Sequence, residues 1–208
     1  MLKLVALLAF GYLLGSVPFG WVVMKVWRNQ DVRTLGSGNI GAANVYRAGG
    51  PGAFAATLIA DGLKGAIPVL VAILLGRPGD PALTPTLVGL AAVVGHSWPI
   101  FLRFRGGKGV ATTGGVMLVL APVAVVLSLV AWFGMIRLTR LASLSSLVAV
   151  GVGFLTLLGL HFGGWQAWRP VDWPVIILGA ALLGLVVYRH RGNIERLASG
   201  REIKLTAH

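Results

Sequence analysis

Long apolar runs limit what this chain can fold into more than any other feature. Six such segments cover residues 4–24, 51–76, 82–102, 110–136, 141–168 and 173–188, and the only Asp, Glu, Lys or Arg within them are Asp61 and Lys64. A transmembrane helix needs about 20 mostly apolar residues. Charged residues make up only 12% of the chain and the mean hydropathy is +0.84, which is too apolar for a soluble domain of 208 residues. We therefore predict an all-α integral membrane protein in which residues 1–208 form a single polytopic domain. The first segment lacks the short apolar core and cleavage site of a signal peptide, so we expect it to be retained.

The basic residues predict the orientation of these segments, because Lys and Arg stay preferentially in cytoplasmic loops. If residues 110–136 crossed once, Arg137, Arg140 and the basic tail would lie outside. A turn near Ala121 and Pro122 would divide this block into two short or re-entrant helices and place every basic cluster inside. We therefore expect about seven transmembrane helices, some short or re-entrant, with an outer amino terminus and a cytoplasmic carboxyl terminus. At 1.5 Å per residue, however, the block is too short for two full crossings of a ~30 Å core.

A literal G-x-G-x-x-G pattern occurs at Gly36, Gly38 and Gly41. A dinucleotide-binding loop needs a buried strand before it. Here a polar segment precedes it, and the acid at ribose-binding distance, Asp61, lies inside an apolar segment, so the dinucleotide interpretation fails. Glycine backbone N–H groups can still close on a phosphate. Further donors follow at Ser37, Asn39, Asn44 and Arg47. A plain glycine-rich turn between helices is the alternative.

Two further segments combine cations with small or polar residues. Arg103, Arg105 and Lys108 surround Gly106, Gly107 and Gly109 directly before an apolar run, where a helix amino terminus would favour an anion. A cytoplasmic retention signal explains the cations but not the glycines. Residues 190–202 mix cations, an amide and acids, and taken alone would be interpreted as a solvated tail.

Three titratable residues within the apolar segments are candidates for a role at the site. Asp61 and Lys64 are three apart on one helical face, so they can form a structural ion pair, or Lys64 can reach the phosphate region. His96 can act as a general base or serve a structural role. The chain has no cysteine, and its four histidines lack ligand spacing, so we expect no metal centre.

Taken together, three segments resemble the bacterial acyl-phosphate:glycerol-3-phosphate acyltransferases, the PlsY family. The similar stretches are GSGNIGAANVYR at 36–47, GHSWPIFLRFRGGKGVAT at 95–112 and HRGNIERLASGRE at 190–202, with DGLKG at 61–65 between them. The chain departs from the family at Ala43, where threonine is frequent, at Trp98, where phenylalanine is, and at Arg105, where lysine is.

The resemblance implies an enzyme of the bacterial inner membrane, with its active site facing the cytoplasm, that begins phospholipid synthesis. It would move a fatty acyl group from acyl phosphate to the 1-hydroxyl of sn-glycerol 3-phosphate, giving lysophosphatidic acid and phosphate. No cofactor is implied. The expected partners are both substrates and membrane lipids, with no nucleic acid, and the protein is expected to be a monomer.

Motif residues follow from the same resemblance. The expected catalytic residues are Ser37, Arg47, His96, Lys108 and Asn193. The expected substrate- and phosphate-binding residues in these motifs are Gly38, Asn39, Gly41, Asn44, Gly106, Gly107, Gly109, His190 and Glu202, and we add Lys64 because of its own position near the phosphate region.

An acyl phosphate is an activated mixed anhydride, so positioning and charge stabilisation can suffice without a covalent nucleophile. We assign phosphate and oxyanion neutralisation to Arg47 and Lys108, and orienting donors to Ser37 and Asn193. The base is either His96 or the substrate's own phosphate. Alternatives that the sequence leaves open are an acyl-CoA or acyl-carrier-protein donor, an anion transporter, and a noncatalytic scaffold that binds anionic lipid.

Overall fold

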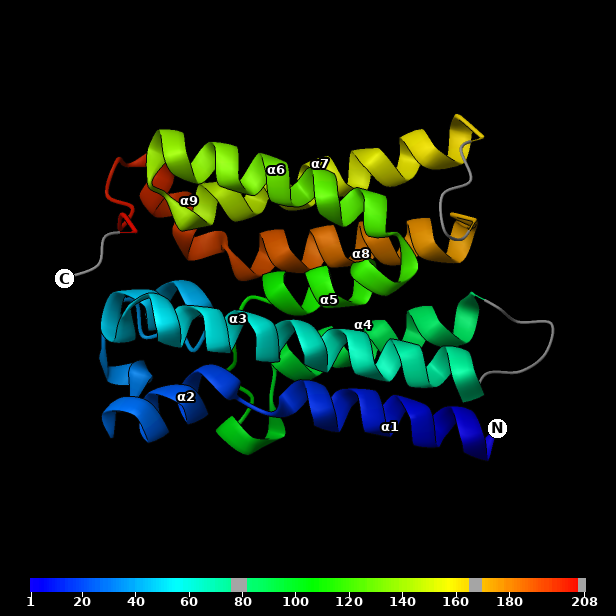
Figure 1. The fold of residues 1–208 in the computed structure, drawn as a ribbon, viewed down its shortest axis with the longest axis horizontal. Coiled ribbons are helices and arrows are strands. Elements are labelled where there is room, and N and C mark those ends of the chain that lie inside the picture. The colour runs from blue at the N-terminus through cyan, green and yellow to red at the C-terminus, as the bar shows by residue number, and fades with distance from the viewer. Residues whose placement is uncertain (76–81, 165–169, 206–208) are drawn as a thin grey trace.

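All regular elements in the described part of the protein are helices, as the computed structural model of residues 1–75, 82–164 and 170–205 shows (Figure 1). In chain order they are α1 (Leu2–Ser16), α2 (Phe19–Arg28), η1 (Val32–Thr34), α3 (Ala42–Leu75), α4 (Leu83–Ser97), η2 (Ile100–Leu102), α5 (Val110–Leu120), α6 (Pro122–Thr139), α7 (Ala142–Phe162), α8 (Trp173–Arg189) and α9 (Arg191–Ala198).

The expected all-α membrane fold is confirmed. Within the described ranges, five helical stretches are long and apolar enough to cross a membrane: Leu2–Arg28, Ala42–Leu75, Leu83–Leu102, Pro122–Thr139 and Ala142–Phe162. A sixth is the pair α8 and α9, which is bent by 60°, and α5 is a shorter apolar helix. The elements along the chain therefore match the expected arrangement of about seven helices, one of them short.

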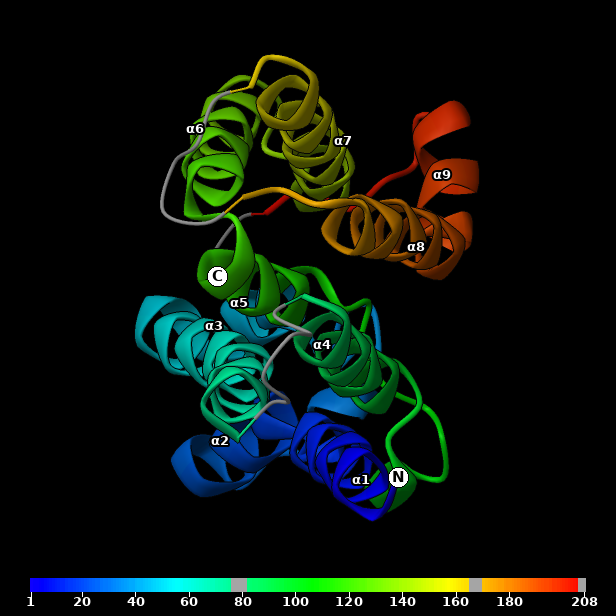
Figure 2. The ribbon, with the colours of Figure 1, turned by 90° about the vertical axis from the view of Figure 1, so that its right-hand side faces the viewer.

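The block at residues 110–136 breaks where the sequence predicts. α5 ends at Leu120, Ala121 is non-helical, and Pro122 opens α6, a position that favours proline. The block was too short for two full crossings, and the two helices in fact differ in length. α6 continues to Thr139 and has 18 residues, enough to cross, whereas α5 has only 11. Figure 2 shows why α5 can be short: it lies between the group α1–α4 and the pair α6 and α7, where protein surrounds it.

The two chain ends lie at opposite ends of the bundle (Figure 1). α2, α4, α6 and α8 all run toward the end that holds the carboxyl terminus, so the basic segments that follow these four helices lie on that side of the bundle. The expected outer turn at 77–81, and the interfacial anchors Trp165 and Trp168, lie outside the described residues.

Glycines allow two helix crossings to come unusually close. On α1, a Cβ at Gly15 would run into the carbonyl of Ala92 on α4, and one at Gly11 would lie 2.8 Å from the carbonyl oxygen of Val88. This fits the small-residue spacing of a packed helix pair. On α7, by contrast, no heavy atom of the described residues outside the local helix lies within 4 Å of a Cβ built at Gly159.

The second close crossing joins α3 to α5. A Cβ at Gly65 would run into the carbonyl of Thr112, and one at Gly115 into the carbonyl of Gly62. Both obstructing atoms belong to backbone, which cannot move aside as a flexible side chain can. This crossing fixes α5 against α3, and with it the polar loop that precedes α5.

Gly65→Ala should therefore lower the stability of the protein by about 1–3 kcal/mol, the usual cost of overpacking. The measurement is thermal unfolding of the purified protein in detergent. Gly134→Ala is the matched control, because Gly134 lies in a helix with nothing within 4 Å of its added Cβ. An equal effect of the two substitutions would show that the α3–α5 contact does not need a glycine.

Candidate active site

A cavity of about 510 Å³ lies between α3, α5, α6 and α7 and reaches the loops at the end that holds the carboxyl terminus. At that end the wall is polar and carries Ser37, Arg47, Lys108, His190, Asn193, Arg196 and Glu202. Away from it the wall is mostly apolar and includes Leu58, Leu118, Leu129, Trp132, Phe154 and Leu182. The cavity thus joins a cationic pocket to an apolar channel.

Asn44 holds the first glycine-rich loop in shape. Its side chain is 2% exposed, its Nδ2 lies 2.9–3.0 Å from the carbonyls of Val32, Leu35 and Asn39, and its Oδ1 accepts from the Ser37 amide at 2.9 Å. A buried amide satisfied in this way replaces the hydrogen bonds that the loop backbone lacks.

Three amides of this loop, those of Ser37, Gly38 and Gly41, are engaged within the protein. Gly38 N–H donates to the carbonyl of Leu35 at 2.9 Å, and Gly41 N–H donates to Asn39 Oδ1 at 2.8 Å. These three amides are therefore not free to bind an anion. The side chain of Ser37, which lines the cavity, remains its outward-facing donor.

The second loop, at Gly106 and Gly107, is engaged on both faces. Gly106 N–H donates to Ser97 O at 3.3 Å, and Gly107 N–H donates to His96 O at 3.1 Å. Arg189 Nη2 donates to Gly106 O at 2.9 Å and its Nε to Gly107 O at 3.0 Å. A Cβ at either position would run into His96, at its carbonyl for Gly106 and at its ring for Gly107. These two glycines therefore permit close packing, and neither lines the cavity.

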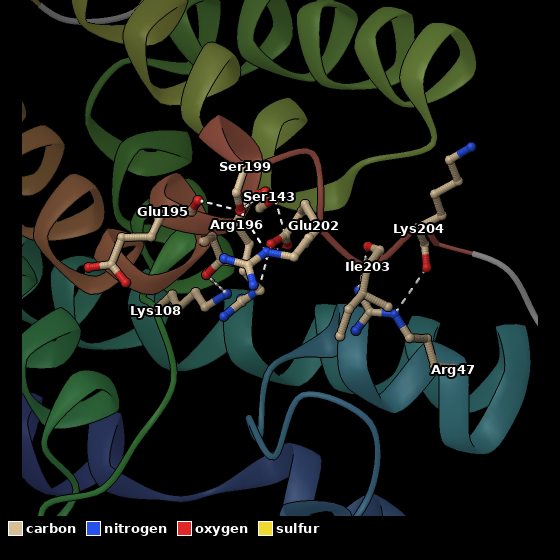
Figure 3. Close-up of polar contacts among 11 residues, drawn as sticks. Arg47, Lys108, Ser143, Glu195, Arg196, Ser199, Glu202, Ile203 and Lys204 are labelled. Atoms are coloured by element: carbon tan, nitrogen blue, oxygen red, sulfur yellow. Dashed lines mark hydrogen bonds and ion pairs between the residues drawn. The ribbon is translucent and has the colours of Figure 1, made fainter.

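Lys108, directly after them, does line the cavity, and a chain of hydrogen bonds continues from it (Figure 3). Its Nζ donates to Asn193 Oδ1 at 2.6 Å, and Asn193 Nδ2 donates to Glu202 Oε1 at 2.6 Å. Glu202 also accepts from Ser143 Oγ at 2.9 Å and pairs with Arg196 Nε at 2.9 Å. The loop before α5, the first turn of α7, α9 and the tail thereby meet at one point.

Burial sets the protonation of this cluster. The pKa of Lys108 is lowered to about 8, chiefly by burial; the charge of Glu202 opposes this lowering, and the cations Arg196, Arg47 and Arg189 add to it. For Glu202, burial alone would raise the pKa. The hydrogen bonds from Asn193 and Ser143 and the charge of Arg196 outweigh burial and hold that pKa below its usual value. Near neutral pH the lysine is charged and the carboxyl is ionised.

Arg47 meets the tail of the chain at the mouth of the cavity (Figure 3). Its Nε donates to Lys204 O at 3.2 Å and its Nη2 to Ile203 O at 3.3 Å. Leu205 N–H donates to the carbonyl of Arg140 at 2.7 Å, so the tail also contacts the link between α6 and α7. The guanidinium has neutral partners here, and no ion pair involving Arg47 occurs among the described residues.

Most of the residues expected at the site meet in this cavity. Those that line it are Ser37, Asn39, Gly41, Asn44, Arg47, His96, Lys108, Gly109, His190, Asn193 and Glu202. Those that do not are Gly38, Lys64, Gly106 and Gly107.

Lys64 takes the structural alternative that the sequence left open. It is 1% exposed, and its Nζ lies 2.9 Å from Asp61 Oδ1 and 2.8 Å from the carbonyl of Val17, at the break between α1 and α2. His96 is 3% exposed, with its ring against Gly107 and its Nδ1 3.7 Å from Asp61 Oδ1. His190 Nδ1 lies 2.8 Å from Val186 O, at the bend between α8 and α9.

Three further residues of the site were not identified from the sequence. Ser143 lies in an apolar segment and carries no motif signal, and its place in the cavity wall and its contact with Glu202 reveal it. Arg196 and Arg189 lie in or beside the third basic segment, where a solvated tail accounts for cations equally well. Their partners, Glu202 and the Gly106–Gly107 carbonyls, identify them.

Comparison with known proteins gives one consistent result. A family model described as glycerol-3-phosphate acyltransferase matches residues 5–200. The glycerol-3-phosphate acyltransferase of Anaeromyxobacter sp. (strain Fw109-5) is 46% identical over 96% of this chain and 95% of its own length. The one from Desulforudis audaxviator (strain MP104C) is 40% identical over 99% and 97%.

Two solved structures match the fold as well. The crystal structure of PlsY (YgiH), an integral membrane glycerol 3-phosphate acyltransferase, superposes with a TM-score of 0.87 in its glycerol 3-phosphate form. That match has 39% identity and covers 98% of this chain and 96% of the other. The lysophosphatidic acid form gives a TM-score of 0.84 at 39% identity, over 97% and 95% of the two chains. On this evidence, the chain belongs to the PlsY family of glycerol-3-phosphate acyltransferases.

Proposed function

We propose that this protein transfers a fatty acyl group from an acyl phosphate to the 1-hydroxyl of sn-glycerol 3-phosphate, releasing lysophosphatidic acid and inorganic phosphate. The observation that carries the proposal is the single cavity with a cationic end and an apolar end. A reaction that joins a phosphorylated polyol to a fatty acyl chain needs both environments at one place.

The cationic end suits two phosphate groups. Arg47, Lys108 and Arg196 line it, and the start of α5 at Val110 lies beside them without a side-chain cap among the described residues. The free N–H groups and dipole of a helix amino terminus favour an anion. Since the amides of Gly106 and Gly107 are engaged, we assign anion binding to the α5 terminus and the cationic side chains.

The apolar end suits the acyl chain. Several of its residues are also exposed on the outside of the bundle, at fractions of 40–59%: Leu58, Leu63, Leu118, Leu129 and Phe133. Exposure of large apolar side chains is expected where hydrocarbon surrounds a protein. We infer that the channel communicates with the bilayer, so that the acyl chain stays in hydrocarbon while its phosphate reaches the cationic end.

The chemistry needs no covalent intermediate. The 1-hydroxyl oxygen attacks the acyl carbon, the bond from that carbon to the phosphate oxygen breaks, and phosphate leaves with the bonding electrons. Charge that develops on the acyl oxygen and the leaving phosphate is stabilised by Lys108 and Arg47. The hydroxyl proton passes to a substrate phosphate, because the His96 ring packs against Gly107 and its position is that of a support for the loop.

The positions of the polar groups bear on two questions: which side of the membrane the active site faces, and whether the protein is an enzyme or a transporter. The basic segments lie at one end of the bundle, and such clusters are retained in the cytoplasm, so we place the active site at the cytoplasmic face of the bacterial inner membrane. A transporter needs access from both faces. Among the described residues the cationic cluster occupies only one, which favours an enzyme that works as a monomer surrounded by membrane lipids.

The deciding experiment uses purified protein in detergent with acyl phosphate and labelled glycerol 3-phosphate. We expect label to move into lysophosphatidic acid with phosphate released in equal amount. Acyl-CoA and acyl-carrier protein are tested in parallel, and faster transfer from either would replace acyl phosphate as the donor. No transfer from any donor would remove the enzymatic proposal.

Lys108→Ala should lower kcat by about 10²–10³-fold, the usual effect of removing a group that stabilises developing charge. Folding is checked by size-exclusion profile and melting temperature. Near-normal turnover would remove Lys108 from the reaction.

The pH dependence should also report Lys108. Because its pKa in the protein is about 8, below the usual value of 10.5, its charge is present below pH 8 and lost above it. We expect kcat/KM to fall as the pH rises through about 8. In Lys108→Arg this alkaline limb should disappear even if the rate is lower, since an arginine keeps its charge. A limb that persists in that variant would assign the titration to another group.

For His96→Gln we expect the acidic side of the pH profile to keep its wild-type shape, because a substrate phosphate accepts the proton. The measurement is kcat/KM from pH 5 to 8 for both proteins. Loss of the acidic limb in the variant would instead identify His96 as the base.

A further inference from the structure

Arg189 contributes an arrangement that the proposed reaction does not itself explain. It is the last residue of α8, and its guanidinium bridges two consecutive carbonyls, those of Gly106 and Gly107, at 2.9 and 3.0 Å. The two donors belong to one rigid plane, so the bridge fixes the orientation of both peptide groups together. The guanidinium also lies 5.3 Å from the ring centroid of Trp98, which holds its plane.

No acidic side chain pairs with Arg189 in the part of the chain that the structure describes. Its hydrogen-bond partners are the two backbone oxygens. A positive charge that is half-buried and has only neutral acceptors would be a poor choice for stability alone. The planar guanidinium of Arg189, which can donate to two carbonyls at once, explains why an arginine stands here; neutralisation of an acid does not.

The opposite face of the same two peptides is held by α4. The amides of Gly106 and Gly107 donate to the carbonyls of Ser97 and His96, so every backbone polar group of the two glycines has a partner. Without side chains, two glycines would otherwise be free to rotate. Of these partners, only Arg189, which donates to the two carbonyls, lies outside α4 and the loop that follows it.

Lys108 directly follows Gly107. The stretch from Arg189 to Asn193 contacts this pair of residues at two points. Arg189 fixes the backbone before Lys108, and Asn193, four positions further on, accepts from its Nζ at 2.6 Å. The turn from α8 into α9 therefore grips the main chain at one point and the ammonium at another. Two fixed points define the path of a flexible four-carbon side chain, whereas one does not.

We propose that Arg189 is a positioning residue of the transfer reaction: by bridging the carbonyls of Gly106 and Gly107, it aims Lys108 into the cavity. Arg189 does not touch the reactants. This inference rests on the role given to Lys108 in the proposed function, and adds the residue that sets its geometry.

The test compares Arg189→Lys, Arg189→Gln and Arg191→Gln with the wild type. Arg191 is the matched control, because it lies two positions away, stacks on the ring of Tyr188 at 4.7 Å, and has no contact with the Gly106–Gly107 loop. A lysine at 189 keeps the charge but cannot bridge two carbonyls with a planar fork. We expect kcat to fall by about 10- to 100-fold in both Arg189 variants, since misplacement of a catalytic group by about 1 Å has effects of this size. Arg191→Gln should keep the wild-type kcat.

The pH profile separates positioning from a general loss of stability. Arg189 is one of the cations that lower the pKa of Lys108, so Arg189→Gln should move the alkaline limb of kcat/KM to higher pH. Arg189→Lys should leave that limb in place while kcat still falls. A protein that is merely less stable would lose active enzyme without moving the limb of the remainder.

Wild-type kcat in Arg189→Lys overturns the proposal, and so does an equal loss of kcat in Arg191→Gln. If Arg189→Gln does not fold, Arg189→Lys alone carries the decision. Failure of the proposed function would be distinct: the wild type would not transfer from acyl phosphate, or its alkaline limb would survive in Lys108→Arg. If the wild type does transfer from acyl phosphate, its alkaline limb disappears in Lys108→Arg, and Arg189→Lys matches the wild type, then only the positioning role fails.

Discussion

Lys108 and Asn193 are 85 positions apart in the sequence, yet a hydrogen bond of 2.6 Å joins them. Each brings its own surroundings to this bond. Lys108 follows the Gly106–Gly107 loop, whose amides donate to carbonyls at the end of α4. Asn193 donates to Glu202, which in turn contacts Ser143 and Arg196. Among the side-chain hydrogen bonds of the described residues, this one joins the groups on α7, α9 and the tail to the loop before α5. It therefore holds together the Lys108 part of the polar end of the cavity.

Other buried polar side chains also have partners within the protein, and Lys64 is the clearest case. Lys64 lies deep in α3, where a bare ammonium would be very unfavourable. It pairs with Asp61 and also donates to the carbonyl of Val17, which the break before Pro18 leaves without a helical partner. The ring of Phe19 lies 5.7 Å from Nζ on the other side of the break. A lysine that sequence reasoning could associate with phosphate thus stabilises a bend between α1 and α2.

Features that depend on local composition could be predicted from the sequence. Apolar length gives the spans, and the placing of every basic cluster on one side required a turn at Ala121 and Pro122 that the structure contains. The three polar segments also predicted where the cavity would be lined. The roles of individual glycines could not be predicted, because a glycine that frees an amide and one that admits a neighbouring ring look the same in a sequence. Gly107 is of the second kind, since the His96 ring occupies the space beside it. Ser143 and Arg189 were missed for a related reason: each acts through a partner from a distant part of the chain.

Arg47 holds the tail by the backbone oxygens of Ile203 and Lys204, and Lys108 is held by the amide oxygen of Asn193. Neither cation is neutralised by a carboxylate in direct contact. Their positive potential is therefore still available to an incoming dianion, which forms stronger, charge-assisted bonds than the neutral oxygens it would displace. Exchange of one of these neutral oxygens for a phosphate oxygen therefore requires no ion pair to be broken first.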